Sequence, residues 1–510
     1  MATAFLQVFE ILSVHPIPLL AFLTFTIILY QWLYIAKTKL PSPRKLPIIG
    51  NLHQLGTLPH KSLRSLSQKH GDLMLLHLGS RPTLVVSSAN VAEEIMKTHD
   101  AVFANRPMNK VASIVLYNGR DIGFAKYGEY YKRIKSICVM HMLSNKKVQS
   151  FRKVREEEIS LMVERIRELT PSMSLNLTES FTSFTNDVVS RVAFGRKYSG
   201  EEGCGNIKEL LNDFVEALGG FTVGDFVPWL SWIDHVSGVL RKANKVAKAF
   251  DSFIEKIVQE HIDGVKLSQN GVEAVKGDEF QDLADVLLEI QRNDPSLERD
   301  TVKALLLDML SAGIETTSTV LEWTMSELLI HPRVMKKLKD EVRGVSNGKT
   351  IINEDDLKNM AYLKAVIKES LRLHPPLPLL LFRESSQDVK VCNNDIAAGT
   401  QVIINAWAIQ RHPTSWDQPE EFLPERYLNT SVDMKGLDFE LIPFGAGRRG
   451  CPGMSFATVK AELVLANLVG LFEWEVPCEM QGDSFMAEAF GTSVHKRDPL
   501  MAISTSYSRN

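Results

Sequence analysis

The sequence lacks several features that would assign it to a common class of protein. Its five cysteines are scattered, and none forms a CxxC pair or a cluster with histidines, which argues against a zinc site or a disulfide framework. The net charge is only −3, so the composition gives no sign of nucleic-acid binding. No repeat with a period of about 20–50 residues is visible. No GxGxxG loop follows an expected strand, so we expect no dinucleotide site in this chain.

The composition fits a large globular chain. Its 510 residues are 45% hydrophobic and 23% charged, which suits one large domain or several. Helical patterns dominate from residue 91 onward. Residues 72–88 alternate as a hairpin, with the turn predicted at Ser80, Arg81 and Pro82. The expected fold class is therefore mainly α with a small β region.

The N-terminal part contains an apolar run at residues 17–36 that carries no charge. About 20 such residues span the hydrocarbon core of a membrane. Basic residues follow directly, whereas Glu10 is the only charge upstream, so the positive-inside rule places the main part of the chain in the cytosol. A cleaved signal peptide is the alternative, but it requires a basic start and a small-residue cleavage site. We predict an anchor at residues 1–38 with a transmembrane helix at about 17–36, a proline-rich hinge at 39–52 and a globular domain at 53–510.

Residues 443–453 form the most informative stretch, because they combine four glycines, two arginines and a cysteine. Glycine lets the backbone approach a ligand closely. Cys451 stands just before an apolar helical pattern that starts near Met454, where backbone N–H groups favour a thiolate. Arg449 offers a rigid fork of donors to a carboxylate. These residue types together suit haem, with iron on the sulfur and a propionate on the arginine. The alternative is a glycine-rich turn with a structural cysteine.

This stretch resembles the haem-ligand signature of the cytochrome P450 family, in the order Phe444, Gly447, Arg449, Cys451 and Gly453. The resemblance implies the cytochrome P450 fold with an N-terminal transmembrane helix. It also implies haem b as the cofactor, with Cys451 as the axial ligand of the iron and the other four residues in the cofactor site.

A long helix is predicted from about residue 300 to residue 330, ending before Pro332. Its centre, residues 312–317, places a glycine, an acid and two threonines in an apolar helix. These residues disfavour a regular helix and bend it through side-chain hydroxyls. The stretch resembles the oxygen-binding motif of the family, and Thr316 and Glu315 then take the catalytic proton-delivery roles. The alternative is a bend capped by threonine, with Glu315 facing solvent.

Further motifs extend the resemblance to about residue 499. Glu369 and Arg372 match the ExxR element, and Arg426 matches its partner, which gives a structural Glu-Arg-Arg network. Haem propionates are expected to contact Arg383, Tyr131 and Lys135. Tyr131 and Lys135 replace the usual tryptophan and arginine, and lysine lacks the bidentate fork. Phe382 replaces the proline that usually precedes the arginine. The substrate pocket is predicted to include Val111, Ile114, Leu116, Ala312, Leu377, Leu379, Leu380, Phe490 and Thr492.

The resemblance is to plant microsomal members of specialised metabolism. It implies a monooxygenase that uses O2 and NADPH electrons from a flavoprotein reductase to oxidise a lipophilic small molecule, such as a terpenoid, a terpenoid-derived alkaloid or a coumarin. The expected location is the endoplasmic reticulum membrane, with one span in contact with lipid and a cytosolic catalytic domain. Two alternatives are a haem-thiolate isomerase, dehydratase or oxidative ring-forming enzyme, and a membrane haem carrier or sensor without catalysis. Thr316 argues against an isomerase, because such members tend to lack it.

Overall fold

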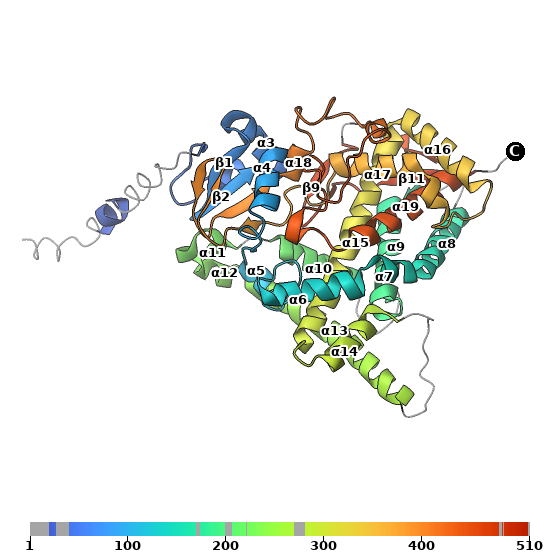
Figure 1. Ribbon diagram of the computed structural model, residues 1–510, viewed down its shortest axis with the longest axis horizontal. Coiled ribbons are helices and arrows are strands. Elements are labelled where there is room, and N and C mark those ends of the chain that lie inside the picture. The colour runs from blue at the N-terminus through green and yellow to red at the C-terminus, as the bar shows by residue number, and fades with distance from the viewer. Residues whose placement is uncertain are drawn as a thin grey trace, which may run out of the picture.

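The computed structural model describes residues 20–26, 40–169, 174–198, 207–220, 222–269, 281–478, 482 and 484–507. Most of the predicted anchor therefore lies outside the described residues. Residues 20–26 are helical, and the large side chains of Leu20, Phe22, Leu23 and Phe25 are exposed. The β1–β2 hairpin lies with α3 and α4 at one end of the globular body, whereas β11 lies among the long helices toward the other end (Figure 1).

Helices are the main elements of the described chain, as the sequence predicts. They are α3 (Pro59–His70), α4 (Ala89–Glu93), α5 (Lys110–Val115), α6 (Glu129–Ile137), α7 (Asn145–Ser150), α8 (Arg152–Leu169), α9 (Leu177–Phe194), α10 (Ile207–Gly219), α11 (Val223–Phe226), α12 (Trp232–Val236), α13 (Val239–Gln269), α14 (Leu283–Asn293), α15 (Arg299–Ile330), α16 (Pro332–Ser346), α17 (Ala361–Leu373), α18 (Ala406–Ile409) and α19 (Met454–Leu471).

The strands form four small sheets. The largest has the order β1-β2-β7-β4, in which β1 (Leu73–Leu78) and β2 (Arg81–Val86) form an antiparallel hairpin and β2 runs parallel to β7 (Gln401–Ile404). The predicted hairpin is confirmed, but its turn is shorter than expected because Arg81 and Pro82 already belong to β2. The remaining strands are β3 (Ser174–Asn176), β4 (Arg383–Glu384), β5 (Val389–Val391), β6 (Asn394–Ile396), β8 (Phe472–Glu475), β9 (Glu488–Phe490), β10 (Val494–Lys496) and β11 (Met501–Ser506).

Helix α15 crosses the middle of the molecule (Figure 1) and packs against α9, α19 and α17. It ends at Ile330 before Pro332, as predicted, because proline disfavours the α conformation in the residue that precedes it. Among the described residues, α15 and α19 are long and apolar enough to cross a membrane. Both are mostly buried inside the protein, so they are core helices.

Candidate active site

A cavity with about 1420 Å³ of space free of protein atoms lies between α15, the loop before α19 and the segment between α17 and β4. The loop contributes Phe444, Cys451 and Gly453, and α15 contributes Ala312 and Thr316. Residues far apart in the sequence, from different predicted motifs, thus meet at one cavity. Most of the exposed lining is apolar, which favours a lipophilic ligand.

The backbone of the cysteine loop is held in a shape that requires glycine at residue 447. Gly447 has a φ of +66°, and a Cβ there would lie 2.4 Å from the carbonyl oxygen of Met96 and 2.7 Å from the Asp100 carboxyl group. Any side chain would therefore clash with both residues. Asp100 also accepts a hydrogen bond from the backbone N–H of Arg448 at 2.8 Å. Gly447 thus fixes the loop on the protein rather than lining the cavity.

Cys451 is a free cysteine whose side chain is exposed to the cavity, deep inside the protein. Burial raises the pKa of its thiol, and the backbone N–H of Gly453, the charge of Lys135 and the N–H of Met454 oppose that rise. The loop was predicted to favour a thiolate, but the effect of burial is larger than that of these groups, and the pKa of the thiol is raised. Metal coordination deprotonates a thiol outright, so an iron bound to Cys451 would supply what the surroundings lack.

Three buried arginines lie along one side of this cavity: Arg106, Arg383 and Arg449. Arg383 contacts Asp100 at 3.2 Å, whereas Arg449 donates to the carbonyl groups of Ala104 and Ala125. Burial, followed by repulsion from Arg383 and Arg449, lowers the pKa of Arg106 well below its usual value. The cluster therefore carries more positive charge than its carboxylate neighbours balance, which suits an anionic group such as a propionate.

Arg106 was missed by the sequence reasoning. Its guanidinium donates to the carbonyl groups of Leu381 at 2.5 Å and Phe382 at 2.8 Å, and to that of Gly123 at 3.1 Å. No local pattern in the sequence distinguishes Arg106 from a surface arginine. Its hydrogen bonds to the carbonyl groups of Leu381 and Phe382 hold the segment before Arg383, in which Phe382 replaces the usual proline.

Tyr131 and Lys135, from α6, both line the cavity. The Tyr131 hydroxyl donates to the carbonyl of Arg448 at 2.7 Å, and the Lys135 ammonium donates to that of Gly450 at 2.7 Å. The Arg449 guanidinium lies over the Tyr131 ring, 3.7 Å from its centre. Both side chains thus hold the cysteine loop in this structure, and their predicted contact with propionates stays a prediction.

Thr316 and Glu315 face different cavities. Thr316 lines the cavity of Cys451, and its hydroxyl donates to the Ala312 carbonyl at 2.7 Å, the type of contact through which a threonine can bend a helix. Glu315 instead lines a second cavity, with about 1520 Å³ of free space, between α9, α10, α15 and the turn after β9. Its carboxylate accepts hydrogen bonds from the Ser493 hydroxyl at 2.6 Å and backbone N–H at 3.2 Å.

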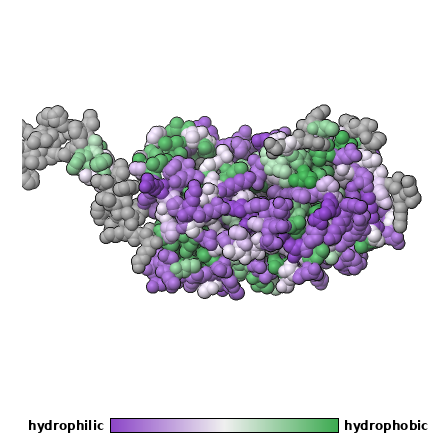
Figure 2. All heavy atoms as spheres, turned by 90° about the horizontal axis from the view of Figure 1, so that it is seen from above, coloured by the Kyte–Doolittle hydropathy of each residue, from purple (hydrophilic) through white to green (hydrophobic). Residues whose placement is uncertain are grey.

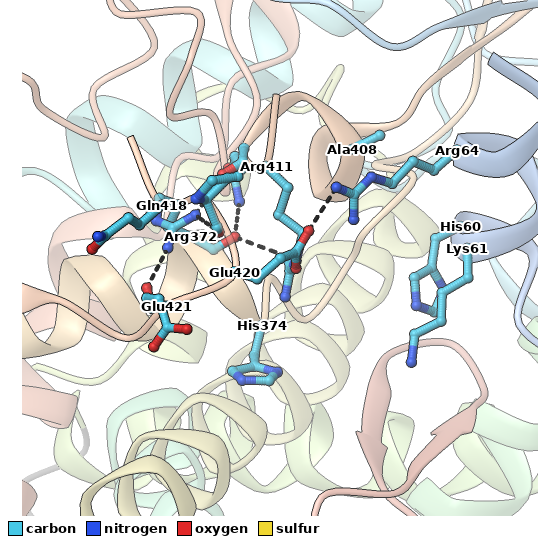
Figure 3. Close-up of polar contacts among 12 residues, drawn as sticks. His60, Lys61, Arg64, Arg372, His374, Ala408, Arg411, Gln418, Glu420 and Glu421 are labelled. Atoms are coloured by element: carbon cyan, nitrogen blue, oxygen red, sulfur yellow. Dashed lines mark hydrogen bonds and ion pairs between the residues drawn. The ribbon is translucent and has the colours of Figure 1, made fainter. Parts of the chain in front are cut away.

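The predicted Glu-Arg-Arg network is present and deeply buried. Glu369 and Arg372 are both 0% exposed and form a bidentate pair at 2.8 and 2.9 Å. Arg426 contacts the same carboxylate at 3.0 Å. Arg372 also donates to the backbone carbonyl of Glu421 (Figure 3).

The network is linked to the cysteine loop by Gln410. Its side-chain amide donates to the carbonyl groups of Leu371 and Arg372 at 3.0 and 2.9 Å, and its oxygen accepts from the N–H of Ile442 at 3.0 Å. Ile442 directly precedes the loop at residues 443–453. The Glu369 network therefore fixes the frame on which the cysteine loop rests.

Several predicted pocket residues do line the cavities. Ala312, Leu377 and Leu380 lie in the wall of the Cys451 cavity. A neighbouring cavity shares Leu377 and Leu380 and adds Leu379, Phe490 and Thr492.

The structure places three other predicted pocket residues elsewhere. Val111 is 1% exposed and Leu116 is 3% exposed, and both belong to the hydrophobic core, with Ile114 packed against it. The cause is helix α5, which the sequence did not predict and which is capped by the Asn109 side chain. Because α5 packs on α13 and α10, its apolar residues face these helices. Ile122 and Gly123, further along the same connection, line the cavity instead.

Comparison with known proteins agrees with this site. The sequence profile of the cytochrome P450 family matches residues 40–500. The chain is 51% identical to cytochrome P450 736A117 of Prunus mume, covering 94% of both chains. It is also 51% identical to cytochrome P450 71A4 of Solanum melongena, covering 92% of both. It is 48% identical to norfluorocurarine oxidase of a Strychnos species, covering 95% of this chain and 96% of the other.

Solved structures share the fold. A zebrafish cytochrome P450 structure with progesterone has a TM-score of 0.73 and 25% sequence identity, covering 88% of this chain and 99% of the other. The chain belongs to the cytochrome P450 family, and its family and fold identify it as a monooxygenase. The haem that this family implies fits the residues present: a thiol, a close backbone loop and a cationic cluster share one cavity.

Proposed function

We propose that this monooxygenase oxidises a lipophilic plant small molecule, of the terpenoid, terpenoid-derived alkaloid or coumarin type, with NADPH electrons supplied by a flavoprotein reductase. The observation that carries the proposal is that Cys451 and Thr316 share a largely apolar cavity. A relative named norfluorocurarine oxidase supports a small-molecule substrate. Leucines from the segment between α17 and β4 form the part of the wall that would contact such a molecule.

Each side chain has a defined task in this proposal. Cys451 would hold the haem iron, while Arg106, Arg383 and Arg449 would hold its propionates. When bound through a thiolate, haem supplies the chemistry that activates O2 and favours cleavage of its O–O bond. Thr316 places a hydroxyl in the cavity where O2 would bind, and this hydroxyl can pass a proton toward it.

Glu315 would supply protons from behind α15. Burial raises the pKa of its carboxyl group, which favours the protonated form. Most of the exposed lining of the second cavity is apolar, but hydroxyl groups, Glu322 and His495 line it together with Glu315. The buried Oδ1 atom of Asn186 also lines it and has no hydrogen-bond partner in the part of the chain that the structure describes. These polar groups could hold water in the cavity, and the water could bring protons to Glu315.

Thr316→Ala tests the proposal in a system reconstituted with reductase and NADPH. We expect product per NADPH to fall by about tenfold or more, with hydrogen peroxide formed instead, since positioned proton transfer contributes ~10²–10⁴-fold. Thr316→Ser keeps the hydroxyl and should retain most of the product yield. Omitting the reductase should stop turnover. Equal product yields for Thr316→Ala and the native protein would contradict the role of Thr316.

The exposed surface supports a location at the endoplasmic reticulum membrane, with the catalytic domain in the cytosol. Trp229, Trp232 and Val236, at and after the end of α11, are exposed by 60–77%, and Ile48 of the hinge is exposed by 46%. The β1–β2 turn contacts both the hinge and the end of α11. The Gly79 N–H donates to the Ile49 carbonyl at 3.1 Å, and the Ser80 N–H donates to the Phe226 carbonyl at 2.7 Å. Apolar patches interrupt the polar surface in Figure 2. Exposed tryptophans beside aliphatic residues are typical of a membrane interface.

Removing residues 1–38 is expected to leave haem binding intact, because the cavity residues all lie beyond the hinge. Binding to lipid vesicles should weaken but persist, and Trp229→Ser combined with Trp232→Ser should remove most of what remains. The measurements are haem content and co-sedimentation with vesicles. Loss of haem on truncation would show that the anchor is part of the catalytic fold, against the proposed domain division.

A further inference from the structure

Lys460 is a buried lysine of α19 that no part of the proposed mechanism uses. Its side chain is 0% exposed and lines the same cavity as Cys451 and Thr316. Among the described residues, no carboxylate lies within ion-pair distance of its ammonium group. An ammonium without a counter-charge is costly to bury. A lysine on an apolar core helix is therefore expected to have a use that offsets this cost.

The Lys460 ammonium donates a hydrogen bond of 2.9 Å to the carbonyl of Gly313 in α15. It also lies 4.4 Å from the centre of the Phe456 ring, which gives the charge a favourable aromatic contact. Within the described part of the chain, its pKa is lowered by burial and by the charge of Arg155 in α8, which a buried bidentate pair with Glu354 balances. The side chain thus spans from one core helix to the turn of α15 that faces the cavity.

The turn of α15 at residues 312–317 receives several side-chain hydrogen bonds. The Thr316 hydroxyl donates to the Ala312 carbonyl, and the Thr317 hydroxyl donates to the Gly313 carbonyl at 3.3 Å. A Cβ on Gly313 would lie 3.2 Å from Val189 in α9, so α9 packs closely there. Side-chain donors to helix carbonyls bend a helix. Lys460 is the one donor to this turn that comes from another helix among those described.

We propose that Lys460 is a positioning residue of the oxygen site, which holds the Gly313 carbonyl and thereby fixes the turn of α15 that places the Thr316 hydroxyl in the cavity. This inference rests on the proposed function, because it assigns Lys460 a role in the same oxygen chemistry. Lys460 touches neither substrate nor the axial cysteine in this account. It acts through the backbone of α15.

Lys460→Met tests the inference, because methionine fills a similar volume without charge or donor. Burial lowers the pKa of Lys460 from 10.5 to about 7, whereas the unfolded chain keeps the ordinary value. The unfolded state therefore binds more protons between these values, and Lys460 makes the native protein less stable as pH falls toward 7. The variant should have a higher Tm than the native protein at pH 7, and a smaller excess at pH 9.5.

Lys460→Met should impair product formation even though it raises the Tm. We expect Lys460→Met to give about tenfold more hydrogen peroxide per product, a smaller effect than the ~10²-fold that a 1 Å misplacement can cost. The infrared C–O stretching band of carbon monoxide bound to the reduced protein should shift or broaden, because it reports on the cavity beside Thr316. Lys390→Met, an exposed lysine of β5, is the matched control and should change neither quantity.

Two outcomes separate this inference from the proposed function. If the native protein oxidises substrate and Lys460→Met leaves both the peroxide ratio and the infrared band unchanged, Lys460 has no positioning role. If the native protein itself forms no product from O2 and NADPH, the proposed function fails. The infrared band, which needs no turnover, then still decides whether Lys460 shapes the cavity.

Discussion

Replacing Cys451 with serine is expected to abolish the reduced carbon monoxide spectrum that is typical of thiolate-bound haem, together with all monooxygenase activity. Serine keeps the size of the side chain but removes the sulfur, so no thiolate can donate electron density to the iron. The change leaves the arginine cluster in place, because Arg106 and Arg383 reach the cavity from other segments and Arg449, in the same loop, is not replaced. Some haem should therefore remain bound to the variant.

Cys392→Ser is the matched control for this experiment. Cys392 is exposed in the turn between β5 and β6, where its thiol contacts Glu94 at 3.1 Å. Its replacement should leave the carbon monoxide spectrum and the activity unchanged. If the thiolate spectrum persists in Cys451→Ser, the assignment of the axial ligand is wrong.

Arg372→Leu is expected to destabilise the protein by about 3–5 kcal/mol, the cost of leaving one member of a buried ion pair without its partner. Glu369 would keep its contacts with Arg426 and with the backbone N–H of Leu423, and the carbonyl groups of Gln410, Pro419 and Glu421 would lose a donor. Because Gln410 links this network to the cysteine loop, haem content should fall together with stability. Urea unfolding and haem content measure the two effects.

A second pair with the same sequence spacing provides the control. Asp355 and Lys358 are also separated by three residues and lie 2.9 Å apart, but their side chains are 57% and 75% exposed. Lys358→Ala should therefore cost no more than about 0.5 kcal/mol, as exposed ion pairs generally do. If Arg372→Leu were as mild as Lys358→Ala, the Glu369 network would not support the fold.

The sequence predicted those parts of the site whose chemistry lies in a short motif. Cys451, Arg449 and Gly447 stand in one loop, and the backbone geometry there leaves no space for a side chain at Gly447. The helix at 299–330 was predicted to within one residue, because Pro332 sets its end. The residues of the Glu369 network were also predicted. Their burial, which makes the Glu369–Arg372 pair important for stability, cannot be read from a spacing of three residues.

Features that depend on long-range packing were not predicted. Arg106 and Arg449 are brought together by the fold alone, and nothing near Arg106 in the sequence marks it. Lys460 looks like an ordinary polar position of a helix until the structure shows it to be fully buried. The assignment of Val111 and Leu116 to the pocket failed because the sequence did not reveal helix α5, which turns them into the core.

The separation of Glu315 from Thr316 has a simple geometric cause. Successive residues of an α-helix point about 100° apart, so two neighbours can face different sides of the helix. Here the acid faces the second cavity behind α15 while the hydroxyl faces the cavity of Cys451. We infer that protons would cross the helix at the turn that Lys460 contacts.

The most direct test of the account is turnover of a panel of apolar plant compounds with reductase, NADPH and ¹⁸O2, followed by mass spectrometry. The account predicts a product that carries one oxygen atom derived from ¹⁸O2, formed only when both reductase and NADPH are present. A product formed without O2 or NADPH would contradict it, and would indicate an isomerase or dehydratase instead.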